Sequence, residues 1–355
     1  MAYEHLIDLN DLSVSKWNEI ISLALKIKKN ESVYSEACKN KILATLFYEP
    51  STRTQMSFQT AMLRLGGQII GFDNPQNSSV SKGENLTDTI RIVSGYADIL
   101  AMRHPLEGAA KAAALYAECP VINAGDGGHL HPTQTLTDLV TLQSEKGSLS
   151  GLTVGLCGDL KYGRTVHSLI KALSMYPDNR FILISTKELS IPQYIKDWMN
   201  SHNCPYRECY SLAEAIPELD VLYMTRIQKE RFASEEEYRQ QKNVYILDMQ
   251  KLFSAKQDLC ILHPLPRVDE IDLNVDKDPR AMYFKQAVNG VYARMALIIT
   301  LLNAREQTSL LSHHNPAVCC SNPKCITNHE TYLEKSYKEN GDLLVCEYCD
   351  ERQLL

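Results

Sequence analysis

The sequence predicts an α/β protein with two parallel-sheet, Rossmann-like domains, a cleft between them, and a small cysteine-rich β domain at its C-terminal end. Two runs of short apolar segments alternate with helix-like patterns, which is the rhythm of βαβ units in a parallel sheet. A long helix with an apolar face follows the second run. Beyond it, five of the eleven cysteines crowd into the last 37 residues.

These patterns divide the chain into three domains. We expect a first domain over residues 1–132 and a second over residues 133–285. The long helix, at about residues 286–304, is expected to pack back on the first domain, and residues 306–355 form the third. A chain of 355 residues is long enough for two domains and a small third one.

The composition, with 44% hydrophobic and 23% charged residues, is that of a globular protein. A formal net charge of −6 provides no basic surface for nucleic acid. The N-terminal segment has no apolar core of a signal peptide, and no apolar run reaches membrane-spanning length. The six cysteines before residue 261 follow no disulfide spacing. We therefore expect a cytoplasmic protein that binds neither nucleic acid nor membranes.

Each element of the first domain follows from its apolar period. In the helix expected at 51–67, Phe58 and Met62 lie one turn apart on one face, and Gly66-Gly67 ends the helix. The other helices of this domain are expected at 13–29, 84–96 and 108–118, and its strands at 41–49, 68–72, 98–104 and 120–125. In the second domain, strands are expected at 152–159, 180–186, 220–225 and 259–265, and a helix at 165–176.

A polar turn, STRT at residues 51–54, lies between the strand at 41–49 and the helix that follows. A helix amino terminus at the carboxyl edge of a parallel sheet offers free N–H groups and a positive dipole end to an anion. The hydroxyls of Ser51, Thr52 and Thr54 and the guanidinium of Arg53 add donors suited to phosphate. The same residue types also suit an ordinary helix cap. This segment alone leaves both interpretations open.

Polar or constrained residues also follow other strands of both predicted sheets, at their carboxyl ends. They are Arg103 and His104, then His131 and Gln134 just before a helix, then Arg164, then Arg226 and Gln228, and finally Pro264 and Leu265. A single arginine after a strand is usually a solvated surface charge. Two arginines at such points in each domain indicate instead that each domain binds one anion.

The sequence lacks an obvious covalent nucleophile. It contains no G-x-S-x-G or H-E-x-x-H motif, no P-loop, and no G-x-G-x-x-G after a strand. Two anion sites without a nucleophile favour a direct transfer between two bound anionic molecules, driven by positioning and charge stabilisation.

Seven motifs together resemble the catalytic chain of the aspartate transcarbamoylase family. They are FYEPSTRTQMSF, SKGENLTDT, MRHP, NAGDGGHLHPTQTLTDL, GDLKYGRTVHSL, YMTRIQKERF and HPLPRVDEI, in family order over about residues 1–305. The resemblance implies a transferase that joins carbamoyl phosphate and L-aspartate to give N-carbamoyl-L-aspartate and phosphate, an early step of pyrimidine (UMP) synthesis. It implies no metal or organic cofactor in the active site.

The resemblance also implies a role for each position. One group would grip the phosphate of carbamoyl phosphate: Ser51, Thr52, Arg53 and Thr54. A second would surround its carbonyl end: Arg103, His131 and Gln134. Two residues would add backbone contacts: Pro264 and Leu265. A last group would hold the two carboxylates of aspartate: Arg164, Arg226 and Gln228.

The family's active sites lie between subunits, which implies a homotrimer or a dimer of trimers. Lys82, together with a serine before it, would reach into the neighbouring site and contact aspartate. The candidate serines are Ser78, Ser79 and Ser81, and the spacing from the Lys-Gly-Glu sequence favours Ser78.

The implied mechanism is attack of the deprotonated aspartate amine on the carbonyl carbon, without a covalent enzyme intermediate. Arg103, Thr54 and His131 would donate hydrogen bonds to the tetrahedral oxyanion. The phosphate would leave with its charge spread over Arg53 and Lys82 and accept the proton itself. A general-base role for His131 is the alternative.

Ornithine transcarbamoylase is the nearest competing enzyme. That relative has a cysteine after the histidine of its HCLP motif, where this chain has Pro264. The TRIQ sequence here adds an arginine suited to a second carboxylate. A non-catalytic subunit on the same fold is an alternative of another class. Such relatives usually lose residues of the phosphate cradle, the name used here for Ser51, Thr52, Arg53 and Thr54, and this chain keeps all four.

Two closely spaced cysteine pairs predict a structural zinc site in the third domain. Cys320 and Cys325 have four residues between them, Cys346 and Cys349 have two, and 20 residues separate the pairs. Tetrahedral Zn²⁺ takes four thiolates at such spacings, and a disordered tail with incidental cysteines is the alternative. Residues not expected as ligands are Cys319, His313, His314 and His329. The segment 331–348 predicts a hairpin with Asn340-Gly341 as a type I′ turn.

This segment resembles the zinc domain of the separate regulatory chain of bacterial aspartate transcarbamoylase, which docks that chain onto catalytic subunits. Only 16 residues lie between Asn303 and Cys320, so the nucleotide-effector domain of that chain has no counterpart here. The resemblance therefore implies a structural role for zinc. ATP and CTP should not shift the aspartate saturation curve, except by weak competition at the phosphate-binding residues.

Overall fold

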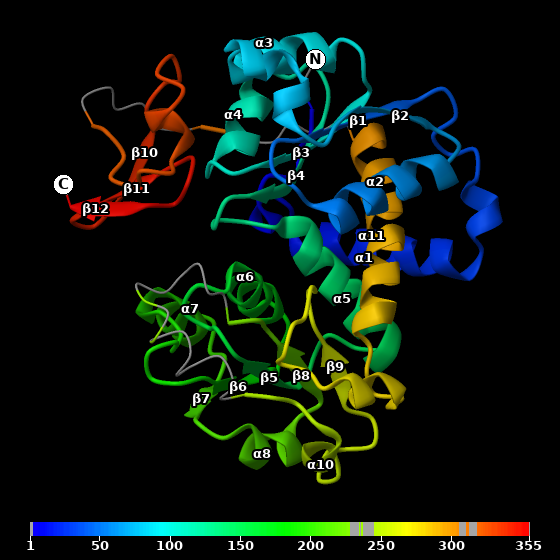
Figure 1. Ribbon diagram of the computed structural model, residues 1–355, viewed down its shortest axis with the longest axis vertical. Coiled ribbons are helices and arrows are strands. Elements are labelled where there is room, and N and C mark those ends of the chain that lie inside the picture. Colours follow the sequence, from blue (N-terminus) through cyan, green and yellow to red (C-terminus); the bar gives the residue numbers. More distant parts are fainter. Residues whose placement is uncertain are drawn as a thin grey trace. The chain divides into compact units, whose positions relative to one another are not determined.

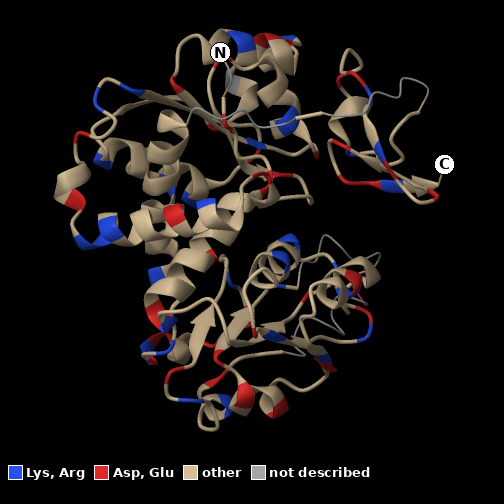
Figure 2. Cartoon of the chain, turned by 180° about the vertical axis from the view of Figure 1, so that it is seen from behind, with Lys and Arg blue, Asp and Glu red and all other residues tan. Residues whose placement is uncertain are grey.

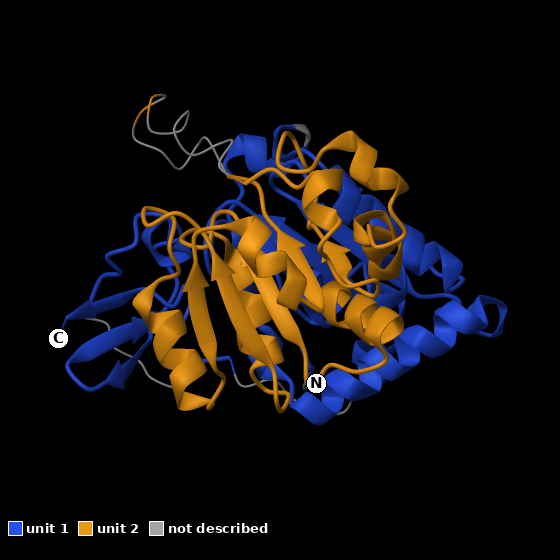
Figure 3. Ribbon diagram, turned by 90° about the horizontal axis from the view of Figure 1, so that it is seen from below, with its two compact units in different colours: residues 1–136, 291–355 blue, residues 137–290 orange. Residues whose placement is uncertain are grey.

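The computed structural model describes residues 3–227, 234, 236, 245–304, 310–311 and 318–354. The chain forms two compact units, one of residues 1–136 and 291–355 and the other of residues 137–290 (Figure 3). Helices α5 (Pro132–Lys146) and α11 (Tyr283–Asn303) each contribute residues to both units. The predicted aspartate ligand Gln228 lies outside the described residues.

Unit 1 is built on a parallel sheet with the strand order β2-β1-β3-β4 (Figure 1). The strands are β1 (Ile42–Phe47), β2 (Gln68–Phe72), β3 (Ile99–His104) and β4 (Val121–Asp126). The helices between and around them are α1 (Val14–Lys29), α2 (Thr52–Arg64), α3 (Leu86–Ser94) and α4 (Ala109–Tyr116). Ala44 and Leu100 of the sheet share one buried cluster with Ile90 of α3 and Ala113 of α4.

The two edges of this sheet differ. Strand β2 is mostly exposed or half-buried, while every residue of β4 is buried. The N-terminal segment covers β4: Leu6 donates its N–H to the carbonyl of Val121 at 2.9 Å and accepts from the N–H of Asn123 at 2.8 Å. In the described part of the chain, β2 is therefore the exposed edge strand of this sheet.

Unit 2 contains a second parallel sheet with the order β7-β6-β5-β8-β9. Its strands are β5 (Thr153–Cys157), β6 (Arg180–Ile184), β7 (Tyr206–Cys209), β8 (Val221–Met224) and β9 (Cys260–Leu262). Its helices, besides the shared ones, are α6 (Arg164–Leu173), α7 (Gln193–Ser201), α8 (Leu212–Ala215) and α10 (Met249–Leu252). The central strands β5 and β8 are buried along their whole length, as strands covered on both faces are.

The C-terminal module, residues 318–354, has its own antiparallel sheet of β10 (Tyr337–Asn340), β11 (Leu343–Cys346) and β12 (Arg352–Leu354). The predicted hairpin is confirmed, but its turn is not. Asn340 pairs with Leu343, so the loop residues are Gly341 and Asp342, and of these two only Gly341 has a positive φ, of 62°. A type I′ turn at Asn340-Gly341 is therefore wrong, because Asn340 stays in the strand ladder and type I′ needs positive φ at both loop residues.

The predicted fold class is confirmed: two parallel α/β sheets and a small β module with clustered cysteines. Gln134 was expected before a helix, but α5 begins at Pro132 and includes it. Strands β7 and β12 were not predicted. Their side chains are largely exposed, so they lack the apolar run that marks the buried strands.

Charged residues of both signs are interspersed over both units (Figure 2). Lys41 pairs with Asp98 at 2.8 Å, joining the starts of β1 and β3. Lys146 pairs with Asp258 at 2.6 Å at the end of α5. Across the described ranges, no helix has both the length and the apolar character that a membrane crossing requires.

Candidate functional site

In unit 1 the predicted phosphate-side residues follow three neighbouring strands. Ser51 lies just after β1, Arg103 is the next-to-last residue of β3, and His131 follows β4. Because β1, β3 and β4 are adjacent in the sheet, their carboxyl ends bring these residues to one edge.

The amino terminus of α2 has the features of an anion site. Ser51 occupies the N-cap position, yet its side chain makes no capping hydrogen bond within the described residues. By contrast, Ser13 caps α1 by accepting from the N–H of Lys16, and Asn85 caps α3 in the same way. The hydroxyl of Ser51 and the first N–H groups of α2 thus remain for a ligand, which favours a phosphate cradle over an ordinary cap.

Arg53 lies in the first turn of α2 and is exposed. Partial burial lowers the pKa of its guanidinium, which nevertheless stays charged at any physiological pH. Arg103 is half-buried and held from two sides: it pairs with Glu49 at 2.7 Å and donates to the carbonyl of Ala124 at 3.3 Å. Its Nε is buried and, among the described residues, makes no hydrogen bond.

The turn from Asp126 to His131 is organised by the buried carboxylate of Asp126. That carboxylate accepts from the N–H of Gly108 at 2.8 Å, the N–H of Leu130 at 3.0 Å and Nδ2 of Asn123 at 3.0 Å. His131 is 7% exposed. One of the hydrogen bonds to Asp126 thus comes from Leu130, the residue directly before His131.

Sequence reasoning missed Arg294 of α11, a buried residue behind the cradle. Its guanidinium donates to the hydroxyl of Ser57 on α2 at 3.2 Å and to that of Thr133 on α5 at 3.4 Å, and it lies over the ring of Phe58. Thr133 in turn lies 3.4 Å from Nδ1 of His131. The sequence signal was present, since an arginine on an otherwise apolar helix face needs a buried partner.

The segment with the candidate serines forms two short 3-10 turns, η3 (Pro75–Asn77) and η4 (Ser79–Lys82). Ser78 donates its hydroxyl to the carbonyl of Pro75 at 2.8 Å, and Ser81 donates to the carbonyl of Ser78 at 2.8 Å. Ser79 and Lys82 are exposed. Lys82 thus lies at the end of a surface turn, in the same unit as α2.

In unit 2 the remaining predicted residues follow β5, β8 and β9, which are neighbours in the second sheet. Arg164 begins α6 after β5, Arg226 follows β8, and Leu265 follows β9. The first two loops are tied together by Thr225, whose hydroxyl accepts from the N–H of Asp159 at 3.0 Å and donates to the carbonyl of Cys157 at 3.1 Å.

A buried pair of His263 and Glu270 shapes the loop after β9. Nδ1 of His263 accepts from the N–H of Leu265 at 2.7 Å, so its proton lies on Nε2, which is 2.7 Å from the carboxylate of Glu270. The other oxygen of Glu270 accepts from the N–H groups of Val268 and Asp269 at 3.1 Å each. Leu265 in this loop has a φ of 53°, a left-handed backbone conformation that residues with a Cβ rarely adopt.

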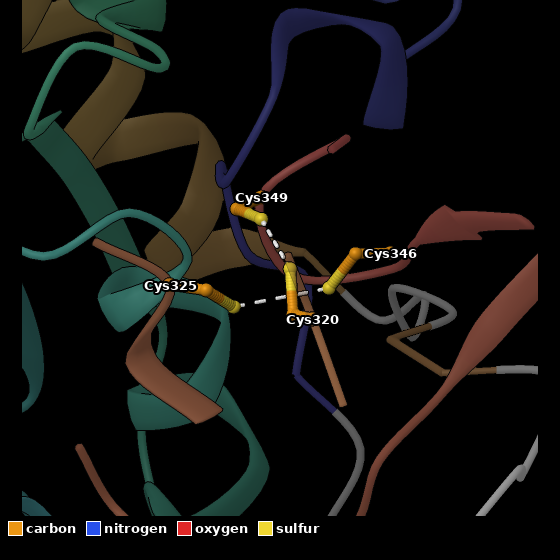
Figure 4. A group of neighbouring side chains, drawn as sticks. All are labelled: Cys320, Cys325, Cys346 and Cys349. Atoms are coloured by element: carbon orange, nitrogen blue, oxygen red, sulfur yellow. Dashed lines mark hydrogen bonds between the residues drawn. The ribbon is translucent and has the colours of Figure 1, made fainter. Parts of the chain in front are cut away.

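Four cysteines of the module meet at one point (Figure 4). Cys320, Cys325, Cys346 and Cys349 are buried, and their sulfurs all lie within 4.8 Å of one another. The Sγ atoms of Cys320 and Cys349 are 3.6 Å apart and those of Cys325 and Cys346 are 3.8 Å apart. The edge of a ZnS₄ tetrahedron is about 3.8 Å, from Zn–S bonds of about 2.3 Å, so the four thiols fit such an ion.

The other candidate ligands of the module point elsewhere. Cys319 is exposed and accepts from Nζ of Lys335 at 2.9 Å. His329 lies 2.9 Å from the carbonyl of Pro323. His313 and His314 are outside the described residues. An ordered, buried cluster contradicts the alternative of a disordered tail with incidental cysteines.

Two family models match the chain. The carbamoyl-P binding domain of aspartate/ornithine carbamoyltransferase matches residues 4–144, and the Asp/Orn binding domain of that family matches residues 150–301. The chain is 60% identical over 300 residues to the aspartate carbamoyltransferase catalytic subunit of Clostridium perfringens, covering 84% of this chain and 98% of that relative.

Solved structures give the same result. The catalytic subunit of M. jannaschii aspartate transcarbamoylase is 47% identical with a TM-score of 0.79, over 84% of this chain and 97% of that one. Aspartate transcarbamoylase from Trypanosoma cruzi, in complex with carbamoyl phosphate and aspartate, is 37% identical with a TM-score of 0.78, over 84% of this chain and 96% of that one.

Proposed function

The chain belongs to the aspartate/ornithine carbamoyltransferase family, and we propose that it transfers the carbamoyl group of carbamoyl phosphate to the amine of L-aspartate. The observation that carries this proposal is the amino terminus of α2, where Ser51 makes no capping hydrogen bond within the described part of the chain and Arg53 and Thr54 follow it, together with Arg103 at the carboxyl end of the neighbouring β3. The products are N-carbamoyl-L-aspartate and phosphate, and the reaction serves pyrimidine synthesis.

Unit 1 holds carbamoyl phosphate in this proposal. The cradle residues and the N–H groups of α2 bind the phosphate, because together they supply a positive field and several donors. Arg103, His131 and Gln134 bind the carbonyl end. The buried Nε of Arg103 supports this role, since a donor kept from water without a protein partner is costly unless a ligand accepts from it.

Unit 2 holds aspartate, with Arg164, Arg226 and Gln228 as donors to its two carboxylates. Pro264 and Leu265 add backbone contacts to carbamoyl phosphate. The convergence of the β5, β8 and β9 ends supports this assignment, because it gathers two arginines and the constrained Leu265 at one edge.

The chemistry then needs no covalent enzyme intermediate. The deprotonated amine attacks the carbonyl carbon, and Arg103, Thr54 and His131 donate to the oxyanion that forms. The carbon–oxygen bond to phosphate breaks, the phosphate keeps the electron pair and takes the amine proton, and Arg53 and Lys82 stabilise its charge.

A colorimetric assay with purified protein tests the proposal. Aspartate should be carbamoylated by carbamoyl phosphate, and ornithine should give less than about 1% of that rate, since Pro264 replaces the cysteine of the ornithine enzymes. Carbamoylation of ornithine alone would assign the chain to the other branch of the family. Inertness with both amino acids would make it a non-catalytic subunit.

We further propose a homotrimer, or a dimer of trimers, in the cytoplasm. The exposed edge strand β2 and the surface turn with Lys82 support contact with a second copy. None of the eleven cysteines, all of them described residues, forms a disulfide, which suits a reducing compartment. In the assembly, Lys82 and Ser78 reach the neighbouring active site.

Shared active sites predict complementation. Lys82→Ala and Arg226→Ala should each lower kcat by about 10²-fold or more, because each removes a charge that binds substrate. When the two variants are dissociated, mixed and reassembled, part of the wild-type activity should return, since some interfaces join two intact halves. Hybrid trimers confirmed by mass spectrometry that remain inactive would show that each chain is self-sufficient.

The hydrogen-bonded pair of His263 and Glu270 should hold the loop after β9 in the conformation that binds carbamoyl phosphate. Glu270→Gln removes the charged acceptor for two N–H groups and for His263, so the KM for carbamoyl phosphate should rise about ten-fold and stability should fall by about 2 kcal/mol. Asp258→Asn, an exposed acid-to-amide change in the same unit, is the matched control. An unchanged KM in a destabilised Glu270→Gln protein would restrict the pair to a structural role.

A further inference from the structure

The C-terminal module docks beside two turns that adjoin predicted site residues. One is the turn 104–108, which follows Arg103, and the other is the turn 126–131, which ends on His131. Module and turns belong to one compact unit, and Figure 1 shows the module next to β4 and α4. The contact is close, because a Cβ placed on Gly108 would lie 2.7 Å from the carbonyl oxygen of Tyr348.

Glu107 is the first link between the module and these turns. Its backbone pairs with Cys325 as in a parallel sheet, and its N–H donates to the carbonyl of Lys324 at 2.9 Å. Its carboxylate accepts from Nδ2 of Asn322 at 2.7 Å and from the N–H of Gly128 at 3.1 Å. The Glu107 side chain therefore joins Asn322, which lies between Cys320 and Cys325 in the sequence, to the turn 126–131.

His129 is the second link. Its Nδ1 lies 3.1 Å from the carboxylate of Asp126 and its Nε2 lies 3.1 Å from that of Asp350 in the module. Burial would lower the pKa of His129, but the charge of Asp126 and the hydrogen bonds to both carboxylates raise that pKa well above its usual value. Both ring nitrogens therefore donate, and His129 is a charged bridge between module and turn.

Asp126 transmits these constraints to the site. It accepts from the N–H of Leu130, directly before His131, and from the N–H of Gly108, directly after Glu107. The N–H of Gly127 donates to the carbonyl of His104 at 2.8 Å. Asp126 thus joins Leu130 to Gly108 and His129, and these last two residues lie against the module.

We propose that the docked module positions the turn 126–131, with Asp350 acting through His129 and Asn322 through Glu107, and thereby sets the affinity for carbamoyl phosphate. This inference rests on the proposed function, which assigns His131 to carbamoyl phosphate. The module supplies no reacting group, so Asp350 and Asn322 are positioning residues. By linkage, carbamoyl phosphate strengthens the docking of the module by the same factor by which the module strengthens its binding.

The test compares Asp350→Asn with Asp342→Asn in the full-length protein. Both remove one acidic charge from the module, but Asp342 is exposed on the hairpin loop. Asp350→Asn should weaken carbamoyl phosphate binding about three-fold, because Asp350 is 58% exposed and an exposed pair contributes modestly. The double variant with Asn322→Ala should weaken it about ten-fold. The KM for aspartate at saturating carbamoyl phosphate should change less than about two-fold in every variant.

Two further readouts separate positioning from a general loss of stability. In a His129→Gln background, Asp350→Asn should have no additional effect on binding, since the bridge is already broken. Amide hydrogen exchange at Gly128 and Leu130 should accelerate in Asp350→Asn without ligand, and exchange in β11 should not.

Each outcome decides the inference. Unchanged carbamoyl phosphate binding in the double variant overturns it, even if exchange in the turn accelerates, because the link would then not reach the site. A loss equal to that of Asp342→Asn also overturns it. A wild-type protein that binds carbamoyl phosphate but carbamoylates neither amino acid would contradict the proposed function and leave the binding comparison valid.

Discussion

Replacing Arg53 with alanine should lower kcat by about 10³-fold or more while leaving the fold intact. In the proposed reaction, charge builds on the phosphate oxygens as the carbon–oxygen bond breaks, and an arginine at that point can contribute three or more orders of magnitude. The side chain is exposed, and α2 is anchored by Phe58 and Met62 rather than by Arg53, so little stability depends on it. Steady-state kinetics with a thermal unfolding curve measures both quantities.

Arg64→Ala is the matched control for this change. Arg64 ends the same helix and pairs with Glu31 at 2.9 Å on the surface, far along α2 from the cradle. Its removal should change stability by less than about 1 kcal/mol and leave kcat unaltered. A folded Arg53→Ala protein with wild-type kcat would remove the cradle from the mechanism.

Changing Cys346 to serine, or removing metal with a chelator, should unfold the C-terminal module. Four thiolates would close the coordination sphere of a bound zinc ion, so we expect the ion to be structural, with no open position for catalysis. A module of fewer than about 40 residues buries too little apolar surface to fold alone, which makes metal binding the main source of its stability. Metal analysis should find about one zinc per chain in the wild type and none in Cys346→Ser.

Unfolding of the module should also destabilise the rest of unit 1. Glu330 and Tyr332 accept from the first N–H groups of α3, at Leu86 and Thr87, and these donors would lose their partners. The buried cluster that Cys325 and Tyr348 share with α4 would be exposed. We expect a lower melting temperature for unit 1 and a weaker assembly.

Cys319→Ser is the control for the metal prediction, because Cys319 is exposed and lies outside the cluster. It should keep zinc content and melting temperature. An ordered module in a Cys346→Ser protein without zinc would show that packing against the rest of unit 1 suffices. Millimolar CTP that shifts the aspartate saturation curve at saturating carbamoyl phosphate would contradict the predicted lack of nucleotide control.

Much of the fold could be predicted because its buried elements repeat locally. Strands β1, β5 and β8 are nearly continuous apolar runs, and α2 repeats apolar residues once per turn. A few consecutive residues therefore suffice to predict the type and burial of each element. The edge strand β7 could not be predicted, because its exposed Arg207 and Glu208 follow no apolar pattern. The hairpin turn was misplaced by one residue, since Asn340-Gly341 suits a type I′ turn locally but strand pairing keeps Asn340 in the ladder.

The candidate site divides in the same way. The sequence by itself predicted the cradle residues, the arginines at the strand ends and the four clustered cysteines, because each prediction depends on residue type at a short spacing or at the end of a strand. Only the tertiary structure decided that Ser51 makes no capping hydrogen bond among the described residues, and that Arg294 donates to Ser57 on α2. It also decided that Asp350 meets His129, a residue 221 positions earlier in the chain. The physical reason is that such contacts join segments far apart in the sequence, and a single polar residue on each segment leaves no periodic pattern in the sequence.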